Sequence, residues 1–192
     1  MMLFKKNYRE ISDEELMSLF TRNDKAAFDE LYRRYSKALL NFFYRMLRCD
    51  REKAEDFLHD LFLKIIESPD KYDESKRFNT WFYTLAGNMI KNEYRNHQVR
   101  QEREKRLAEE QYHSFDVNNE AVDKDRFSKQ LEAELDKLNT ELKTIFNLRF
   151  REGMSVKKIS EIIKCSEGTV KSRLFYISKQ LSKKLSYFTK LF

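Results

Sequence analysis

Three polar side chains, Asp56, His59 and Asp60, have a spacing that places them on one face of a helix. A carboxylate and an imidazole held together can bind a metal ion or move a proton, as in a metal-dependent hydrolase. No second histidine-rich segment completes such a site, since His97 and His113 lie in or beside a charged stretch. The chain also has no glycine-rich phosphate loop and no nucleophile motif of the G-x-S-x-G type. We therefore expect a protein that is not an enzyme and that binds no metal or cofactor.

A second group of polar residues lies in SEGTVKSRLFYISKQL, residues 166–181. The apolar residues of this stretch have the spacing of a buried helical stripe, and no acidic residue follows Glu167. The opposite face consists of short polar and basic side chains: Thr169, Lys171, Ser172, Arg173 and Lys179. Such side chains reach phosphates and base edges, and Arg173 could bind a guanine through two hydrogen bonds, which a neighbouring carboxylate would weaken. The alternative is a bundle helix with a solvated basic side.

The residues just before this stretch predict a helix-turn-helix, the motif whose second helix lies in the DNA major groove. Ser155 and Ser166 can each cap a helix by accepting a backbone N–H two or three residues further on. Ser160 is a small residue at the expected crossing of the two helices. The expected small core consists of Val156, Ile159, Ile163, Val170 and Leu174. Lys164 stands where many such turns have Gly, so we expect a left-handed backbone there, strained by about 1 kcal/mol.

A third group mixes aromatic, amide and basic residues in KYDESKRFNTWFYTLAGNMIKNEYR, residues 71–95. One face of the predicted helix, opposite its apolar stripe, carries Asn88, Lys91, Asn92 and Arg95. The residues just before it are Lys76, Arg77, Phe78, Asn79 and Thr80. Unstacked bases stack on aromatic rings and form hydrogen bonds with amides. Trp81 and Phe82 are expected to belong to the core, whereas Asn88 and Asn92, one turn apart, are expected to be functional.

Elements with helical periodicity position all three groups. Apolar residues recur at steps of three and four over two helices in residues 11–47, then after Asp50 up to Pro69, and again from Trp81. The second of these helices is expected to be capped by Asn23 or Asp24. The periodicity returns over residues 127–138 and 142–150, with Gly153 at a position typical of a helix C-terminus. With three Gly and one Pro in 192 residues, the chain favours long helices and an all-α fold.

Charge is distributed unevenly along the chain. The net charge is +6, but residues 126–192 contain 15 Lys and Arg against 7 Asp and Glu, and the first 125 residues contain 23 against 25. This asymmetry indicates a polyanionic partner for the C-terminal part, or else a solvated basic surface. Residues 98–125 are charged and poor in large apolar residues, which predicts a linker with fluctuating helix at its basic start. We expect two small helical domains, residues 10–97 and 126–185, joined by it.

Several features bear on location. No apolar run approaches the roughly 18 residues needed to span a bilayer. The first residues, MMLFKKNYRE, lack the apolar core and cleavage site of an export signal. Cys49 and Cys165 form no metal or redox spacing, which suits a reducing compartment. The sequence therefore predicts a cytoplasmic protein that does not insert into a membrane.

With these motifs the chain resembles an extracytoplasmic-function (ECF) sigma factor, a small member of the sigma-70 family. DREKAEDFLHDLFLKIIE, residues 50–67, resembles region 2.2, which binds the clamp helices of RNA polymerase. RFNTWFYTLAGNMIKNEYR, residues 77–95, resembles regions 2.3 and 2.4, which melt and read the −10 promoter element. LNTELKTIFNLRFREGMSVKKISEIIKCSEGTVKSRL, residues 138–174, resembles region 4, which reads the −35 element. The resemblance covers nearly all of the chain outside the linker.

The resemblance implies roles for three sets of residues. The contacts to core polymerase would be Asp56, His59, Asp60, Phe62 and Leu63, although His59 departs from the glutamine often found there. The −10 strand would contact Asn88, Lys91, Asn92 and Arg95. A loop of Ser75, Lys76, Arg77, Phe78, Asn79 and Thr80 would form the pocket for an extruded base. The −35 duplex would face Ser166, Thr169, Lys171, Ser172, Arg173, Phe175 and Lys179.

The resemblance also implies a function and partners. A protein of this family is a transcription initiation factor whose partners are core RNA polymerase, through the β′ clamp helices and the β flap, and promoter DNA. An anti-sigma factor, membrane-bound or soluble, commonly holds such a protein inactive. The remaining alternative is an ordinary two-domain DNA-binding regulator whose N-terminal helices sense a ligand or dimerise. That alternative leaves the face of Asn88 and Asn92 without a task.

Overall fold

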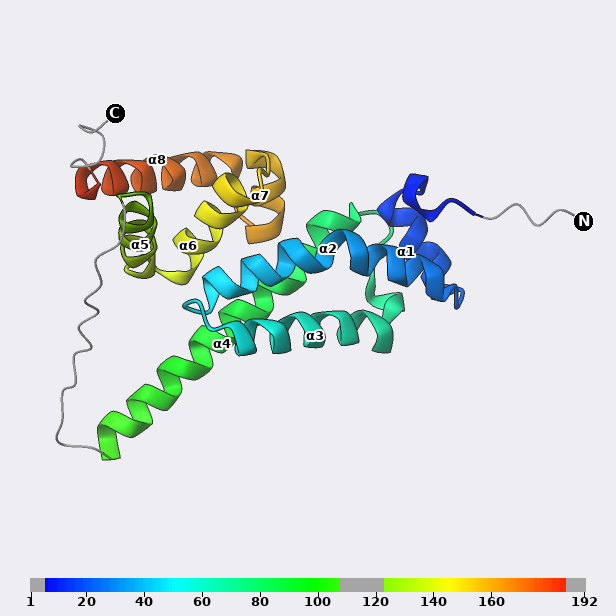
Figure 1. The fold of residues 1–192 in the computed structure, drawn as a ribbon, viewed down its shortest axis with the longest axis horizontal. Helices are drawn as coiled ribbons and strands as arrows, with labels where there is room; N and C mark the ends of the chain where they lie inside the picture. Colours follow the sequence, from blue (N-terminus) through cyan, green and yellow to red (C-terminus); the bar gives the residue numbers. More distant parts are fainter. Residues whose placement is uncertain (1–5, 108–122, 186–192) are drawn as a thin grey trace, which may run out of the picture. The chain divides into compact units, whose positions relative to one another are not determined.

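The computed structural model describes residues 6–107 and 123–185, and within them every regular element is helical (Figure 1). The α-helices are α1 (Asp13–Thr21), α2 (Lys25–Met46), α3 (Arg51–Glu67), α4 (Phe78–Leu107), α5 (Asp123–Asp136), α6 (Thr140–Phe146), α7 (Val156–Ile163) and α8 (Glu167–Lys184). The short elements are the 3₁₀ turns η1 (Tyr8–Glu10) and η2 (Pro69–Lys71) and the π-helical turn η3 (Asn147–Arg151). The predicted all-α class is confirmed.

The chain divides into two compact units, and the division falls inside α4, after Met89. Helix α4 continues to Leu107, past the end predicted for the first domain at His97. Residues 98–107 are rich in Gln, Arg, Glu and Lys, which favour helix even without an apolar stripe. The helix therefore includes the first part of the predicted linker, and residues 108–122 of that linker lie outside the described residues.

Side-chain caps explain where several helices begin. The caps of α1, α2 and α3 are Ser12, Asp24 and Asp50, and each accepts the backbone N–H three residues on. Asp24 is thus the cap of α2, while its alternative Asn23 adopts a left-handed φ of 67°. Ser166 caps α8 in the same way, with 3.0 Å between its hydroxyl and the nitrogen of Thr169. These local bonds satisfy N–H groups that have no partner within the helix.

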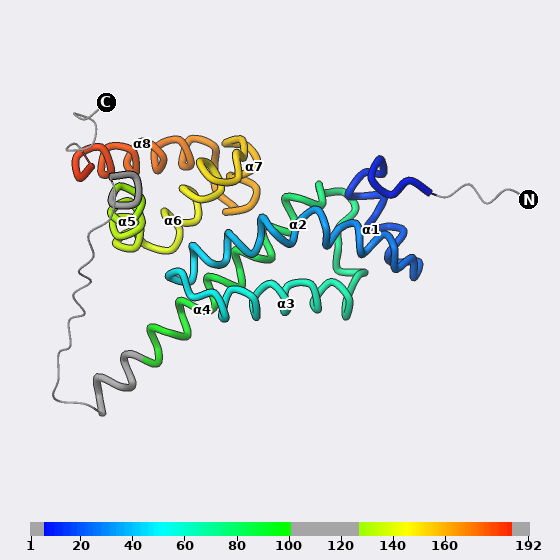
Figure 2. Tube along the Cα trace, in the orientation of Figure 1, coloured from blue at the N-terminus to red at the C-terminus, as the bar shows by residue number. Residues whose placement is uncertain are grey.

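The core of the first unit forms where α1 and α3 pack on α2 and the start of α4 completes the bundle (Figure 2). Aromatic rings from three helices meet there. The ring centroid of Tyr35 lies 5.4 Å from that of Phe78 and 5.5 Å from that of Phe82. Phe62 lies 5.3 Å from Phe82 in an edge-to-face arrangement. Phe78 and Phe82 are fully buried, so α4 is fixed to the bundle by its first turns.

Helices α7 and α8 form the predicted helix-turn-helix, which belongs to the second unit except for residues 161–164. Ile159 and Val170 are fully buried, Ile163 is buried, and Val156 and Leu174 are half-buried, so the expected small core is present. Ser160 is 9% exposed and donates its hydroxyl hydrogen bond to the carbonyl of Lys157.

A left-handed residue makes the turn between α7 and α8 short. Lys164 has φ of 60°, as expected from its position, and Cys165 donates its N–H to the carbonyl of Ser160 at 3.1 Å. This six-to-one hydrogen bond is the Schellman end of a helix, which normally has Gly at the left-handed position. Ser166 then begins α8 at once. This short turn requires a left-handed backbone at Lys164, which is strained in a residue with a Cβ atom.

We expect Lys164→Gly to stabilise the helix-turn-helix by about 0.5–1 kcal/mol, because relief of left-handed strain outweighs the added chain entropy of glycine. Hydrogen exchange of the α7 and α8 amides in the full chain measures this locally, since the single tryptophan lies in the other unit. Glu161→Gly, at an exposed position inside α7, is the matched control and should destabilise by about 1 kcal/mol. Faster exchange in Lys164→Gly would show that the lysine is not strained.

Candidate nucleic-acid and polymerase interfaces

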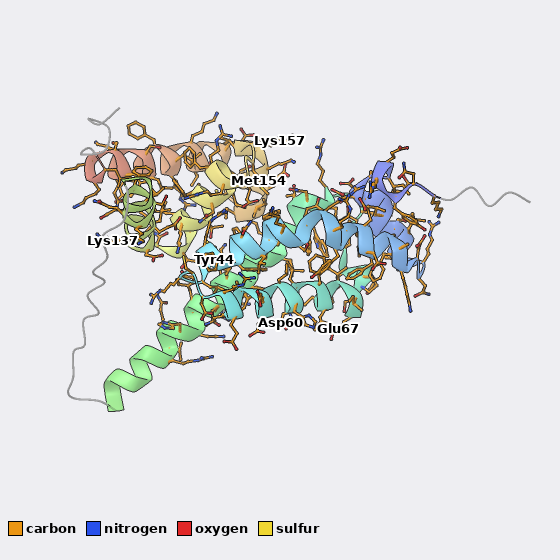
Figure 3. All side chains as sticks on the ribbon, viewed as in Figure 1. Tyr44, Asp60, Glu67, Lys137, Met154 and Lys157 are labelled. Carbon is orange, nitrogen blue, oxygen red and sulfur yellow. The ribbon has the colours of Figure 1, made fainter. Side chains whose placement is uncertain are left out.

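Helix α3 presents an acidic and apolar strip to solvent. Asp56, His59 and Asp60 are exposed together, as their spacing predicts. The next turn adds Leu63 and Ile66, which are 37% and 47% exposed. Figure 3 shows Asp60 on the side of α3 that faces away from α2. The strip therefore combines carboxylates with uncovered apolar side chains, a composition that suits a protein partner.

Phe62 does not belong to this strip, contrary to the expectation that it is a polymerase contact. Its side chain is 4% exposed, and its ring contacts those of Phe28, Tyr32 and Phe82 at centroid distances of 5.8, 4.7 and 5.3 Å. The residue lies on the same stripe of α3 as Leu58 and Ile65, so helix geometry turns it inward. Tyr32, 46% exposed, covers this part of the cluster.

The loop between η2 and α4 is organised by Asp73. Its carboxylate accepts hydrogen bonds from the backbone N–H and the hydroxyl of Ser75, at 3.1 and 2.6 Å. It also pairs with the ammonium of Lys76 at 2.8 Å, and these bonds, that of Lys76 foremost, lower the pKa of Asp73 to about 2. The predicted −10 contacts Ser75 and Lys76 thus have an internal anionic partner, whereas Arg77 is exposed.

The predicted pocket residues at the start of α4 lie mostly inside the protein. Phe78, which was expected to help form the pocket for an extruded base, is fully buried in the aromatic cluster, so its ring is not exposed to a ligand. Thr80 is 6% exposed and Asn79 is half-buried. Two buried oxygens, Asn79 Oδ1 and Thr80 Oγ1, have no hydrogen-bond partner in the described part of the chain. Unpaired buried polar atoms are uncommon in proteins, which marks this turn as unusual.

The amide and basic residues further along α4 are brought together as expected. Asn88, Lys91, Asn92 and Arg95 are all exposed. They follow one another at steps of three, one and three on a continuous helix, with Ile90 fully buried on the other side. The sequence reasoning placed this face correctly because it required only the helical period.

The exposed face of α8 carries polar residues and two aromatic side chains. Lys171, Ser172 and Lys179 are exposed and Thr169 is half-buried. The hydroxyl of Ser166 accepts the N–H of Thr169 and lies 2.9 Å from its hydroxyl, so Ser166 acts first as the helix cap.

Two aromatic residues on α8 are unusually exposed. Phe175 is 70% exposed, as its assignment to the −35 face requires. Tyr176 is 55% exposed and was missed by the sequence reasoning. Its position one turn after Ser172 was the available signal, because residues four apart share a helix face.

Arg173 is the residue of α8 that departs most from expectation. Its Nη1 atom lies 2.7 Å from Oε1 of Glu141 in the first turn of α6, and both side chains are about one-third exposed. The same nitrogen lies 4.0 Å from Sγ of Cys165. A carboxylate therefore sits beside the guanidinium, and the expected wholly basic face is interrupted at this position. The ion pair links α6 to the recognition helix.

Two general features of the described residues, 6–107 and 123–185, complete the description. Their His, Cys, Asp and Glu side chains form no group of three or more that could hold a metal ion. None of the helices in these ranges has the length and apolar character needed to cross a membrane.

Comparison with known proteins gives the same two regions. The family model "Sigma-70 region 2" matches residues 31–100, and "Sigma-70, region 4" matches residues 128–181. The ECF RNA polymerase sigma-E factor of Haemophilus influenzae is 29% identical over 185 residues, which cover 92% of this chain and 96% of the relative. The RNA polymerase sigma-H factor of Pseudomonas aeruginosa is 27% identical over 185 residues, covering 90% and 93%.

Solved structures show the same fold. CnrH in complex with the cytosolic domain of CnrY matches with a TM-score of 0.68 at 20% identity, covering 91% of this chain and 97% of that chain. The sigma factor RpoE in complex with the anti-sigma factor NepR from Bartonella quintana matches with a TM-score of 0.65 at 19% identity, covering 83% and 96%. The two family matches and the sigma-factor relatives define a factor that directs promoter-specific transcription initiation. The chain belongs to the ECF group of the sigma-70 family.

The ion pair changes what we expect of Arg173. If Arg173 orients α8 through Glu141, then Arg173→Ala and Glu141→Ala each weaken binding to a −35 duplex by about two- to fivefold, and the losses do not add. Base preference stays unchanged in both variants. Anisotropy titrations on matched and mutated duplexes measure this. Lys179→Ala is the charge-loss control and should weaken all sequences alike, with the salt dependence reduced by about one ion.

A different outcome would show that Arg173 contacts DNA directly. Relaxed preference at one promoter position in Arg173→Ala, with Glu141→Ala unaffected, would show that the guanidinium leaves its carboxylate to bind a guanine.

Proposed function

We propose that the chain starts transcription through three separate surfaces. The exposed strip of α3 binds core RNA polymerase, the 73–77 loop with the first turn and the amide face of α4 captures the single-stranded −10 element, and α8 binds the −35 duplex. The observation that carries the proposal is the α4 face. Asn88, Lys91, Asn92 and Arg95 are exposed in one row on a helix whose first turns are fixed by buried rings. In an ordinary DNA-binding regulator, whose helix-turn-helix already binds the DNA, such a row would have no function.

The chemistry of the −10 surface follows from its exposed groups. The rings of Phe78 and Phe82 are buried and leave only Trp81, half-buried, at the surface of this turn. Recognition of an unstacked base therefore rests mainly on hydrogen bonds from amides, with Lys91 and Arg95 binding the phosphates. A base costs a few kcal/mol to unstack, which several such bonds together offset.

The polymerase surface is amphipathic. Asp56 and Asp60 provide negative charge, while Leu63 and Ile66 provide apolar area for the centre of the contact. A partner helix with basic and apolar residues, such as a clamp helix of core polymerase, is complementary to this strip. The function requires no chemical reaction by the chain itself, so we propose a non-enzymatic factor that acts in the cytoplasm, where polymerase and DNA are found.

We also propose an anti-sigma partner. RpoE was solved with the anti-sigma factor NepR, and CnrH with the cytosolic domain of CnrY. This chain has the same fold and offers exposed apolar side chains in both units, on α3 and on α8. A protein that covers these side chains would block polymerase and promoter together, and a membrane-bound or a free partner would serve equally.

Replacement of Asn88 tests the −10 assignment. With the chain bound to core polymerase, Asn88→Ala should lower affinity for a single-stranded −10 oligonucleotide by about five- to tenfold, because one or two hydrogen bonds are lost. Duplex −35 binding should stay unchanged. Asn41→Ala, an exposed asparagine on α2, is the matched control. Equal loss of −10 and −35 binding would contradict the division between the surfaces, as would no loss at all.

Charge reversal on α3 tests the polymerase assignment. Asp60→Arg should weaken binding to core polymerase by about tenfold or more, because a complementary charge becomes a repulsive one. Helical circular dichroism should not change, since Asp60 is exposed. Asp70→Arg, an exposed aspartate in η2, controls for the change in net charge. Unchanged polymerase binding, together with failure to support promoter-selective transcription, would favour the DNA-binding regulator instead.

A further inference from the structure

Helix α4 begins without a cap of its own. Phe78 is its first residue, and the carbonyl of Arg77 accepts the N–H of Trp81 at 3.1 Å, so Arg77 occupies the cap position. An arginine side chain has only donors and cannot accept a backbone N–H as Ser12, Asp24 or Asp50 do. The first turn of α4 therefore needs an acceptor from elsewhere.

That acceptor comes from α1. Oε1 of Glu14 accepts the backbone N–H of Phe78 at 3.0 Å, across 64 residues of sequence. A carboxylate at this place also interacts favourably with the positive end of the helix dipole. Glu14 thus does for α4 what a local aspartate does for α2 and α3.

Helix α1 is itself held firmly, so Glu14 sits on a fixed support. The adjacent Asp13 accepts the hydroxyl of Tyr35 and pairs with Arg34 at 2.6 Å. Arg34 also donates to the backbone carbonyls of Tyr8 and Arg9, at 3.0 and 3.1 Å. These bonds tie η1 and α1 to α2, and α1 lies against η2 at the entrance to the loop.

The loop is closed from its other side by Tyr72. The tyrosine is 6% exposed, and its hydroxyl donates to the carbonyl of Lys76 at 2.6 Å. Its ring centroid lies 5.6 Å from that of Phe78 and 5.2 Å from that of Trp81. Burial raises the pKa of Tyr72 to about 12, and the charge of Glu14 adds to this effect, which agrees with their proximity. The exposed residues 73–77 are therefore held between a buried tyrosine and the Glu14–Phe78 bond.

We propose that Glu14 is a positioning residue for capture of the −10 strand, holding the start of α4 and the 73–77 loop in the geometry that receives an unstacked base. The inference rests on the proposed function of this loop. Asn79 directly follows the Phe78 amide that Glu14 binds, and its buried Oδ1 atom has no hydrogen-bond partner in the described part of the chain. A preformed loop lowers the conformational cost of binding, so loss of the support weakens capture without removing a DNA contact.

The test uses the full chain bound to core polymerase and three variants. Glu14→Ala removes the acceptor, Glu14→Gln keeps an oxygen that can accept the Phe78 N–H, and Glu15→Ala alters an exposed neighbour on the same helix. Glu14→Ala should lower affinity for a single-stranded −10 oligonucleotide about three- to tenfold, the effect of losing one cap. Glu14→Gln should stay within about twofold of the parent, and Glu15→Ala should match it. Core-polymerase and −35 duplex binding should not change in any variant.

A second measurement reads the bond itself. Amide hydrogen exchange at Phe78 should accelerate in Glu14→Ala and remain slow in Glu14→Gln. Unchanged exchange in Glu14→Ala, or equal losses of −10, −35 and polymerase binding, would overturn the inference. Failure of the proposed function is distinguishable, because Asn88→Ala would then also leave −10 binding intact. If Asn88→Ala is impaired and Glu14→Ala is not, only the role of Glu14 is wrong.

Discussion

Tyr35 from α2, Phe62 from α3, and Phe78 and Phe82 from α4 meet in one buried aromatic cluster. Edge-to-face contacts between such rings contribute about 0.5–1.5 kcal/mol each beyond the burial of their area. The strip of α3 and the amide face of α4 lie on the outer sides of helices whose inner sides form this cluster. The ring packing therefore fixes the first turns of α4 relative to α3. Neither surface could keep its geometry if the rings packed otherwise.

Internal ion pairs moderate the basic surfaces. Lys76 is bound by Asp73, and Arg173 by Glu141, so two cations assigned to DNA already have carboxylate partners in the free protein. A phosphate that binds such a cation replaces a partner instead of water, and the net gain is smaller than for an exposed lysine. Under the proposed function, exposed cations such as Lys171 and Arg95 then contribute more of the electrostatic attraction to DNA.

The helix-turn-helix contains one strained residue, Lys164, whose conformation is fixed by the interactions around it. Lys164 adopts a left-handed backbone, yet the Schellman bond from Cys165 and the cap at Ser166 enforce the turn from both sides. Ile159 of α7 and Val170 of α8 are both fully buried, which further fixes the two helices in the core. Strain of this size persists only where the surroundings over-determine the conformation. The motif tolerates Lys164 because the stabilisation from core packing and helix caps exceeds the free-energy cost of its left-handed backbone.

The sequence by itself determined the helices, the caps at Asp24, Ser155 and Ser166, the helix-turn-helix and the α4 face, because periodicity and capping act within a few residues. It placed Phe82 in the core correctly, but it assigned two other buried aromatic residues to contact surfaces. Phe62 and Phe78 looked like surface contacts, and only the packing of three helices buried them. The sequence also did not predict interactions between residues far apart in the chain. These are the ion pair of Glu141 with Arg173 and the hydrogen bond from the Phe78 amide to Glu14. These pairs depend on the angles and offsets at which helices pack, and no local pattern of residue types encodes those angles.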